Sequence, residues 1–300
     1  MSSESIPSTL KLSALLLFGM ASFAFAPILV RFAGDVHPLM LAVIRTVSAV
    51  IMLLPFWLSK RANNEFPAWE KKDIWLSVAA GAFLGLHFIS WFFSLAYTSV
   101  ASASVLVTIH PIILIVVESV MRTNRFKVLT WFGVFVAFSG SIILSFVDSE
   151  PVVATPNPAL GNAFAIMAAI FFVFYILLSR KLRYKARWLD FVFRVYAGTA
   201  VTCVILFFGL GLPIQAAPIA IVCGILLAAG PQILGHGSVN YSVKYVSPTL
   251  LSTLILAEPV FAILLAIALF SEIPTLAEIL AMSTILFGVM LTWIGGTKKN

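Results

Sequence analysis

The strongest constraint on this chain is a series of long apolar runs separated by short polar breaks. A helix needs about 20 apolar residues to cross the hydrocarbon core of a bilayer, and most of these runs have that length. Backbone N–H and C=O groups find no water inside a bilayer, so such runs cross it as α-helices. We expect an all-α integral membrane protein with ten spans, at residues 12–33, 36–58, 74–97, 101–121, 126–147, 159–180, 188–208, 216–236, 246–270 and 276–295.

The composition excludes a soluble domain. Hydrophobic residues make up 61% of the chain and charged residues only 10%, against about 45–50% and about 25% in soluble proteins. The first apolar run is too long for the core of a signal peptide, so we treat it as the first span. Lys and Arg exceed Asp and Glu by 19 to 12, but the basic residues gather in short loops. That pattern favours a lipid bilayer and a small-molecule substrate as partners, with no nucleic acid.

The loop charges also predict the orientation. If the N-terminus is cytoplasmic, the inner loops hold nearly all of the basic residues and the outer side keeps only Arg31. An excess of Lys and Arg in short loops marks the cytoplasmic side. We therefore expect both termini to be cytoplasmic.

The two halves of the chain match each other weakly at a nearly constant offset. A shift of 148 residues lays His110-Pro111 on Glu258-Pro259, and a shift of 149 lays Arg45 on Arg194. We expect a first five-helix repeat over residues 1–147, a periplasmic linker over 148–158 and a second repeat over 159–300. Because five is odd, the two copies must enter the membrane in opposite orientations, which gives an inverted repeat.

These features together resemble the drug/metabolite transporter superfamily. The stretch Ile255 to Val260, with its acidic-Pro pair, and the later Ser271-Glu272 are similar to the hallmark of EamA-type exporters. The resemblance implies a multi-pass protein of the bacterial inner (plasma) membrane that exports amino acids, aromatic ones included. His110 stands where an acidic partner of Glu258 is expected, which argues against a mechanism with two equivalent carboxylates.

Ionisable residues in the middle of spans need a reason, because each costs roughly 2.5–3.5 kcal/mol on insertion scales. His110 and Glu258 each precede a proline about halfway along a span. Proline frees a carbonyl one turn back and lets the helix bend, so polar groups beside it can face a cavity. The two residues are either a titratable pair near the substrate path, or groups that lock the bends.

A second polar set lies on the third and eighth spans, which correspond in the two repeats. His87 and Trp91 are one turn apart, and so are Gln232 and His236. With Tyr175 on the sixth span they offer hydrogen-bond partners and an aromatic wall, which suits a small zwitterion or an aromatic ring. We predict that the substrate lies between these two spans, near the bilayer midplane. The alternative for Trp91 is a position that faces lipid.

Arg45 and Arg194 lie about two turns inside their spans. They either attract a substrate carboxylate, or reach the interface or a nearby acid such as Asp190. Ser77, Gly81 and Gly85 recur every four residues, which favours a packing seam within one chain over a dimer interface. We expect a monomer or a weak homodimer. The candidate gating bends are Pro27, Pro111, Pro231 and Pro259.

The sequence has no phosphate loop, no His-Glu-x-x-His and no Gly-x-Ser-x-Gly. We therefore expect no enzymatic activity, no cofactor and no bound metal. The interpretation is a secondary transporter that exports small neutral or zwitterionic metabolites, amino acids first, by alternating access through a central cavity. Efflux of drugs or other hydrophobic compounds is the main alternative, ahead of a channel or an intramembrane enzyme. Proton coupling and facilitated diffusion are both compatible with the sequence.

Overall fold

A computed structural model describes residues 7–98, 100–147, 157–258, 260–261, 264 and 275–297. The described part is built of helices, with one isolated antiparallel bridge between Phe126 and Thr297. By its internal contacts the chain forms two compact units. Unit 1 comprises Met1–Phe93 and Phe174–Tyr245, and unit 2 comprises Ser94–Val173 and Val246–Asn300.

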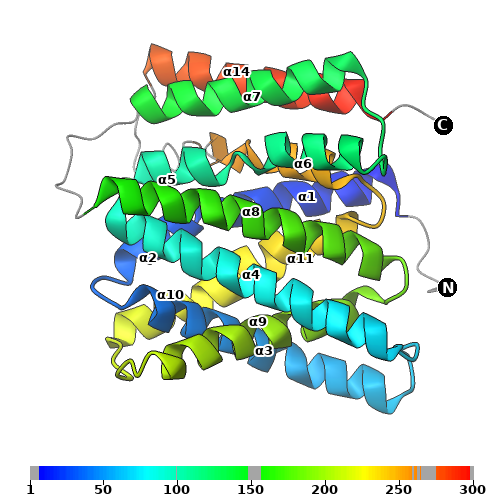
Figure 1. Cartoon of the computed structure of the whole chain (residues 1–300), viewed down its shortest axis with the longest axis vertical. Coiled ribbons are helices and arrows are strands. Elements are labelled where there is room, and N and C mark those ends of the chain that lie inside the picture. The colour runs from blue at the N-terminus through cyan, green and yellow to red at the C-terminus, as the bar shows by residue number, and fades with distance from the viewer. Residues whose placement is uncertain are drawn as a thin grey trace. The chain divides into compact units, whose positions relative to one another are not determined.

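Unit 1 contains the first three predicted spans together with the seventh and the eighth. Prolines begin α3 and α10, where the missing N–H costs nothing because the first turn leaves it unpaired anyway. Its helices are α1 (Thr9–Ala24), α2 (Ala26–Phe32), α3 (Pro38–Ala62), most of α4 (Lys71–Tyr97), the end of α8 (Pro158–Arg183), α9 (Trp188–Gly209), α10 (Pro218–Leu227), the π-helix η1 (Ala228–His236) and α11 (Gly237–Ser242) (Figure 1).

Small residues set the packing inside unit 1. A Cβ placed on Gly81 of α4 would lie 2.4 Å from the carbonyl oxygen of Val195 on α9, so only glycine allows this approach of the two helices. Gly85 contacts the next turn of α9 at Thr199 and Thr202. The stripe on α4 is therefore a packing seam within one chain, as predicted. On the other side α9 packs against α3 (Figure 1).

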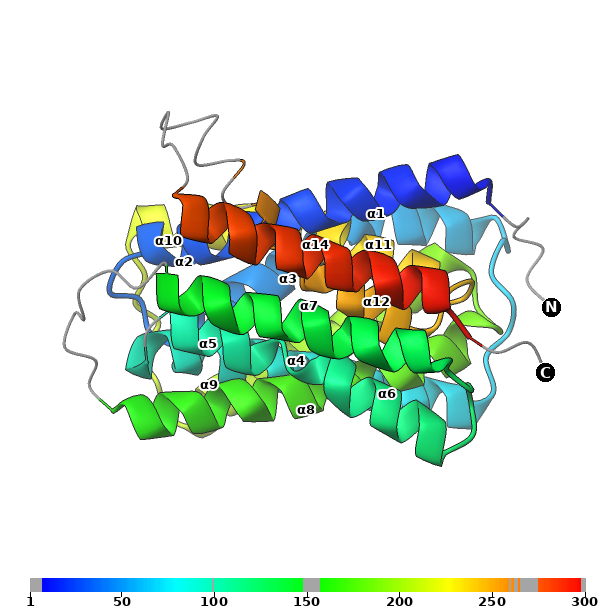
Figure 2. The same cartoon turned by 90° about the horizontal axis from the view of Figure 1, so that it is seen from above.

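Unit 2 contains α5 (Val100–Val107), α6 (His110–Val120), α7 (Val128–Val147), the first part of α8, α12 (Pro248–Ile255) and α14 (Leu276–Gly295). Helices α7 and α14 lie side by side in both views (Figures 1 and 2). A Cβ on Gly133 would meet Thr292, and one on Gly140 would meet Ile285. Rising numbers on α7 thus face falling numbers on α14, so the pair is antiparallel with glycine at its closest points.

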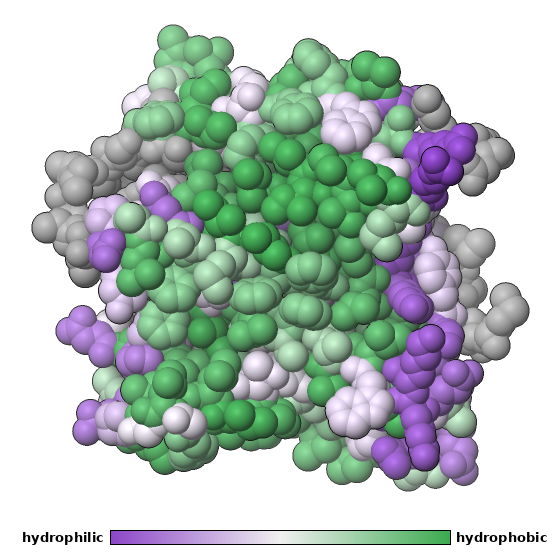
Figure 3. Space-filling view, in the orientation of Figure 1, coloured by the Kyte–Doolittle hydropathy of each residue, from purple (hydrophilic) through white to green (hydrophobic). Residues whose placement is uncertain are grey.

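Eight helical segments in the described part are long and apolar enough to cross a membrane, and a shorter apolar helix covers Val128–Leu144. They fall on nine of the ten predicted spans. The ninth span, 246–270, is only partly described, so the count of ten stays a prediction. Figure 3 shows apolar side chains over most of the face in view, with hydrophilic side chains gathered toward its left and right edges.

The two compact units do not coincide with the two repeats. Unit 1 takes α1 to α4 from the first half of the sequence and α9 to α11 from the second. Unit 2 combines α5 to α7 with α12 and α14. Each unit is therefore assembled from pieces of both halves.

Three of the four candidate gating prolines lie at interruptions of a span. Pro27 follows the break between α1 and α2, and Pro111 follows the turn between α5 and α6. Pro231 lies inside η1, where wider π-type turns replace the α-helix. Pro259 lies outside the described residues. A role for these prolines in gating stays a prediction.

Candidate functional site

Three of the predicted site residues meet in unit 1 around the ring of His236. Its centroid lies 6.1 Å from that of His87 and 6.0 Å from that of Tyr175. Phe88 at 5.1 Å and Phe23 at 4.9 Å complete the group, both edge-on to the imidazole. All five side chains are buried. The structure thus joins α1, α4, α8 and η1 through two imidazoles and three aromatic rings.

Close approach of η1 to α1 depends on glycine. A Cβ on Gly235 would lie 2.6 Å from the Phe23 ring, so a larger residue would push this ring away from the neighbouring His236. The π-helix therefore brings both its backbone at Gly235 and the His236 side chain into the aromatic group.

Gln232, another of the predicted site residues, contacts Arg45 rather than the aromatic group. Arg45 Nε donates a hydrogen bond to Gln232 Oε1 at 3.1 Å, and the Tyr196 hydroxyl donates to the Gln232 backbone oxygen at 2.6 Å. That same backbone oxygen accepts the π-helical bond from the Gly237 N–H. Gln232 therefore connects η1 with α3 and α9.

Arg45 is buried in the core of unit 1, only 2% exposed. The interpretation that this side chain reaches the membrane interface is wrong, because its guanidinium carbon lies 3.8 Å from the centroid of Phe88 and 5.9 Å from that of Phe92. Phe88 thus contacts both the Arg45 cation and the His236 ring. A cation over an aromatic face is stabilised by the ring quadrupole.

Arg194, at the matching position of the second half, has a different environment. Its Nε lies 2.9 Å from Asp190 Oδ1, one turn earlier on α9. The predicted alternative, in which Arg194 pairs with this nearby acid, is confirmed. Asp190 is fully buried and also accepts hydrogen bonds from two indoles, Trp57 Nε1 at 2.8 Å and Trp69 Nε1 at 2.6 Å. This carboxylate is therefore satisfied within the chain.

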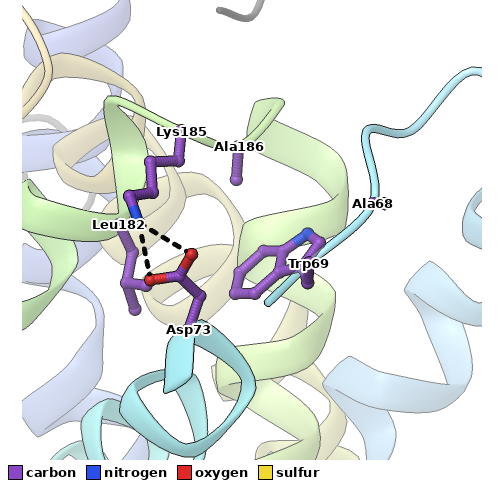
Figure 4. A pocket seen from close by; sticks show the side chains of 6 residues that line it. All are labelled: Ala68, Trp69, Asp73, Leu182, Lys185 and Ala186. Carbon is purple, nitrogen blue, oxygen red and sulfur yellow. Dashed lines mark hydrogen bonds and ion pairs between the residues drawn. The ribbon is translucent and has the colours of Figure 1, made fainter. Parts of the chain in front are cut away.

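A shallow pocket lies at the loop end of unit 1 (Figure 4). One of its walls is Trp69, which also donates a hydrogen bond to Asp190. Lys185 Nζ contacts both carboxylate oxygens of Asp73 there, at 3.0 and 2.9 Å. The hydrogen bonds that Lys185 donates to the Asp73 carboxylate raise the pKa of Lys185. No predicted site residue lines the pocket, whose walls are Ala68, Trp69, Asp73, Leu182, Lys185 and Ala186. We regard it as part of the loop packing.

Tyr175 and Arg183 of α8 both bind α11. The Tyr175 hydroxyl donates to Asn240 Oδ1 at 2.7 Å, and Arg183 Nε donates to the Asn240 backbone oxygen at 3.0 Å. Asn240 is fully buried. These bonds fix the segment that follows the π-helix.

Three predicted residues remain, one in unit 1 and two in unit 2. Trp91 packs against the apolar cluster that includes Ile89, Phe92 and Cys203. His110 and Glu258 belong to unit 2. The buried His110 ring lies 4.5 Å from that of Phe172, and Glu258 follows the turn that ends α12.

Sequence reasoning missed a carboxylate in unit 2. Glu118 is buried near the end of α6 and accepts from Asn124 Nδ2 at 2.6 Å and from Thr249 N at 2.9 Å. Thr249 lies in the first turn of α12, where backbone N–H groups have no partner within the helix. Glu118 therefore caps α12 from another helix. Among the described residues, no group of three or more His, Cys, Asp or Glu is placed to hold a metal ion.

Comparison with known proteins gives this architecture a family. A model of the EamA-like transporter family matches residues 11–146 and again 159–294. Both ends of the second match lie 148 residues after those of the first, the offset that the sequence comparison found.

Similar proteins agree with the family match. The "Uncharacterized transporter YxxF" of Bacillus subtilis (strain 168) is 22% identical over 85% of this chain and 80% of its own length. The "Uncharacterized transporter YdfC" of the same organism is 24% identical over 73% and 71%. A solved protein crystal structure shares the fold, with a TM-score of 0.75 over 95% of this chain and 98% of its own, at 16% identity. Since the family model covers both halves, the chain belongs to the EamA-like transporter family.

Proposed function

We propose that this protein is a secondary transporter that exports small neutral or zwitterionic metabolites, amino acids first and aromatic ones included. Transport itself follows from the family. The observation that supports the substrate class is the buried group in unit 1, where His87, Tyr175 and His236 meet inside apolar helices. Polar groups in such a place are costly unless they have a function, and aromatic walls with few polar groups suit a small amphipathic ligand.

The charge of the site supports a substrate with little net charge. Phosphorylated metabolites are bound by several cations. Arg194 is already neutralised by Asp190, which removes one of the two intramembrane arginines that sequence analysis considered. A hydrocarbon drug, in turn, would offer no acceptor to the buried amide NH₂ of Gln232, which has no partner among the described residues.

The proposed cycle is alternating access of an inverted repeat. Two repeats inserted in opposite orientations can exchange conformations, which opens a site first to one side and then to the other. The breaks at Pro27 and Pro111 and the π-helix around Pro231 are the proposed bending points, because the helical hydrogen-bond ladder is interrupted there. We place both termini in the cytoplasm of a bacterium, on the loop charges alone.

Reconstitution of the purified protein into liposomes tests the proposal. Labelled phenylalanine, leucine, a hydrophobic cationic drug and a nucleotide sugar are offered in parallel, with empty liposomes as the control. We expect saturable counterflow of the amino acids, at rates far below channel flux. Flux of the drug or the nucleotide sugar alone contradicts the proposed substrate class, and unsaturable flux indicates a channel.

Residue contributions can be separated with two variants. Gln232→Leu removes a hydrogen-bond partner, so transport of every polar substrate should fall. Trp91→Ala should weaken the binding of aromatic substrates more than that of small ones, because stacking on Trp91 contributes about 0.5–1.5 kcal/mol. If both variants insert normally and transport the panel like the parent, the substrate site lies elsewhere.

A further inference from the structure

Arg45 and Gln232 together offer hydrogen-bond donors without a matching acceptor. In the described part of the chain, Arg45 donates one hydrogen bond, from Nε to Gln232 Oε1. The buried Nε2 of Gln232 has no partner there. The contact with Nε fixes which amide atom is the oxygen, because a guanidinium cannot donate to an NH₂ group. Two Nη groups and an amide NH₂ therefore remain as donors.

The cation is also without a counter-charge. No carboxylate among the described residues forms an ion pair with Arg45, whereas the Asp190 carboxylate meets Arg194. A buried charge is stable only when it is paired and hydrogen-bonded. Phe88 covers one face of the guanidinium, but a ring face offers no acceptor for in-plane N–H groups. The missing partner is thus an anion with acceptor oxygens.

We propose that Arg45 and Gln232 bind the carboxylate of the transported metabolite. A guanidinium matches a carboxylate with two parallel N–H···O bonds, and the Gln232 amide adds a third donor from η1. One cation suits the single negative charge of a carboxylate and is too little for a phosphate dianion. The proposal rests on the function proposed above in one respect, that the ligand is the transported molecule.

The location on η1 gives this binding a mechanical consequence. Gln232 Oε1 accepts from Arg45 of α3 and its backbone oxygen from Tyr196 of α9, so a carboxylate held by Arg45 and Gln232 would add a second tie between the π-helix and α3. Release of the carboxylate would loosen one of these ties. Binding is in this way coupled to the bending point at Pro231.

The experiment compares acids with their amides. Phenylalanine is paired with phenylalaninamide, and phenylacetate with phenylacetamide, which tests the carboxylate without an ammonium group. Thermal stabilisation of the detergent-purified protein is measured in chloride-free buffer, with sodium chloride as a separate arm. The variants are Arg45→Gln and Gln232→Glu. Arg194→Gln is the matched control, because it removes the same side chain from the corresponding position of the second repeat.

We expect the parent to bind each acid about tenfold more tightly than its amide, the scale of a hydrogen-bonded ion pair. Arg45→Gln should abolish this preference. Gln232→Glu should also abolish it in a folded protein, because it supplies a carboxylate to Arg45 from within the chain. Arg194→Gln should keep the preference despite lower stability.

Other outcomes overturn the proposal. They are an absent acid preference in the parent, its persistence in Arg45→Gln, or its persistence in Gln232→Glu if the first variant does not fold. A chloride response equal to that of the acids, and lost in Arg45→Gln, assigns the site to an inorganic anion instead. The proposed function fails separately, when the acid preference behaves as expected but liposomes show no amino-acid counterflow.

Discussion

Arg45 and Arg194 occupy corresponding positions of the two repeats, yet the chain treats them in opposite ways. Asp190 lies one turn before Arg194 and neutralises it, with two indoles to complete the carboxylate's hydrogen bonds. One turn before Arg45 the residue is Leu41, which belongs to the apolar core of unit 1. Arg45 has an amide and a phenyl ring instead.

The difference shows that the repeat keeps a cation but not its counter-charge. Where the acid is present, the arginine stabilises the helix ends and the loop between α3 and α4. Where the acid is absent, the buried charge of Arg45 destabilises the protein, and binding of an anionic ligand would offset this destabilisation.

Replacing the acid of the second repeat by the leucine of the first should have the largest effect. Asp190→Leu leaves Arg194 and two indole N–H groups without their acceptor, and breaking a buried pair costs about 3–5 kcal/mol. The measurement is the thermal unfolding midpoint in detergent. Asp190→Leu combined with Arg194→Leu should regain part of the loss. If the unfolding midpoint of Asp190→Leu equals that of the parent, the bonds of Asp190 to Arg194 and the two indoles do not stabilise the protein.

The reciprocal change adds the missing acid to the first repeat. Leu41→Asp places a carboxylate one turn before Arg45, so Arg45 should offset much of the cost of burying it. A double-mutant cycle with Arg45→Gln should give a favourable coupling of about 1–3 kcal/mol. Zero coupling would mean that the two side chains do not meet, and that the repeats differ in backbone geometry as well as in charge.

Phe88 should contribute to the stability of Arg45 beyond its packing. A desolvated cation–π contact contributes about 2 kcal/mol, so Phe88→Leu should lower the unfolding midpoint more than Phe92→Leu does. Phe92 is the matched control because it is equally buried but lies 5.9 Å from the guanidinium against 3.8 Å. In an Arg45→Gln background the difference between the two substitutions should become smaller, and what is left reflects the contact of Phe88 with His236.

The exposed loop pairs should have the smallest effect. Hydrogen bonding from Lys60, with help from Arg187, lowers the pKa of Glu65. A carboxyl group with a lowered folded pKa adds stability above its unfolded pKa of 4.5 and loses it as the pH falls through the folded value. Glu65→Gln should therefore change the unfolding midpoint slightly at pH 7, and the difference should shrink as the pH falls below 4.5. High salt should also reduce the difference.

Much of the fold could be predicted because hydrophobicity and charge are local properties. Runs of about 20 apolar residues identify helices without knowledge of their neighbours, and a constant offset identifies the repeat. The partition into units could not be predicted, because it depends on which distant helices pack together. Gly81 and Gly133 mark close contacts in the sequence, but α9 and α14 as their partners appear only in three dimensions.

The candidate site was predicted in part for a similar reason. His87, Gln232 and His236 stand out because polar residues are rare in spans, and the Asp190–Arg194 pair follows from helical spacing. The sequence could not show that Gln232 turns toward Arg45, since the π-helix changes the angle between successive residues. Glu118 was missed because its role as a cap depends on Thr249, 131 residues away.

The pairing of α7 with α14 also bears on how the protein is made. Helix α7 ends at Val147, and its partner begins at Leu276 near the end of the chain. At about 5–20 residues per second, a ribosome needs on the order of ten seconds to synthesise the intervening chain. During that time the glycine face of α7 is without the helix it fits. Biogenesis must therefore keep an inserted but unpaired helix from wrong associations until α14 has been synthesised.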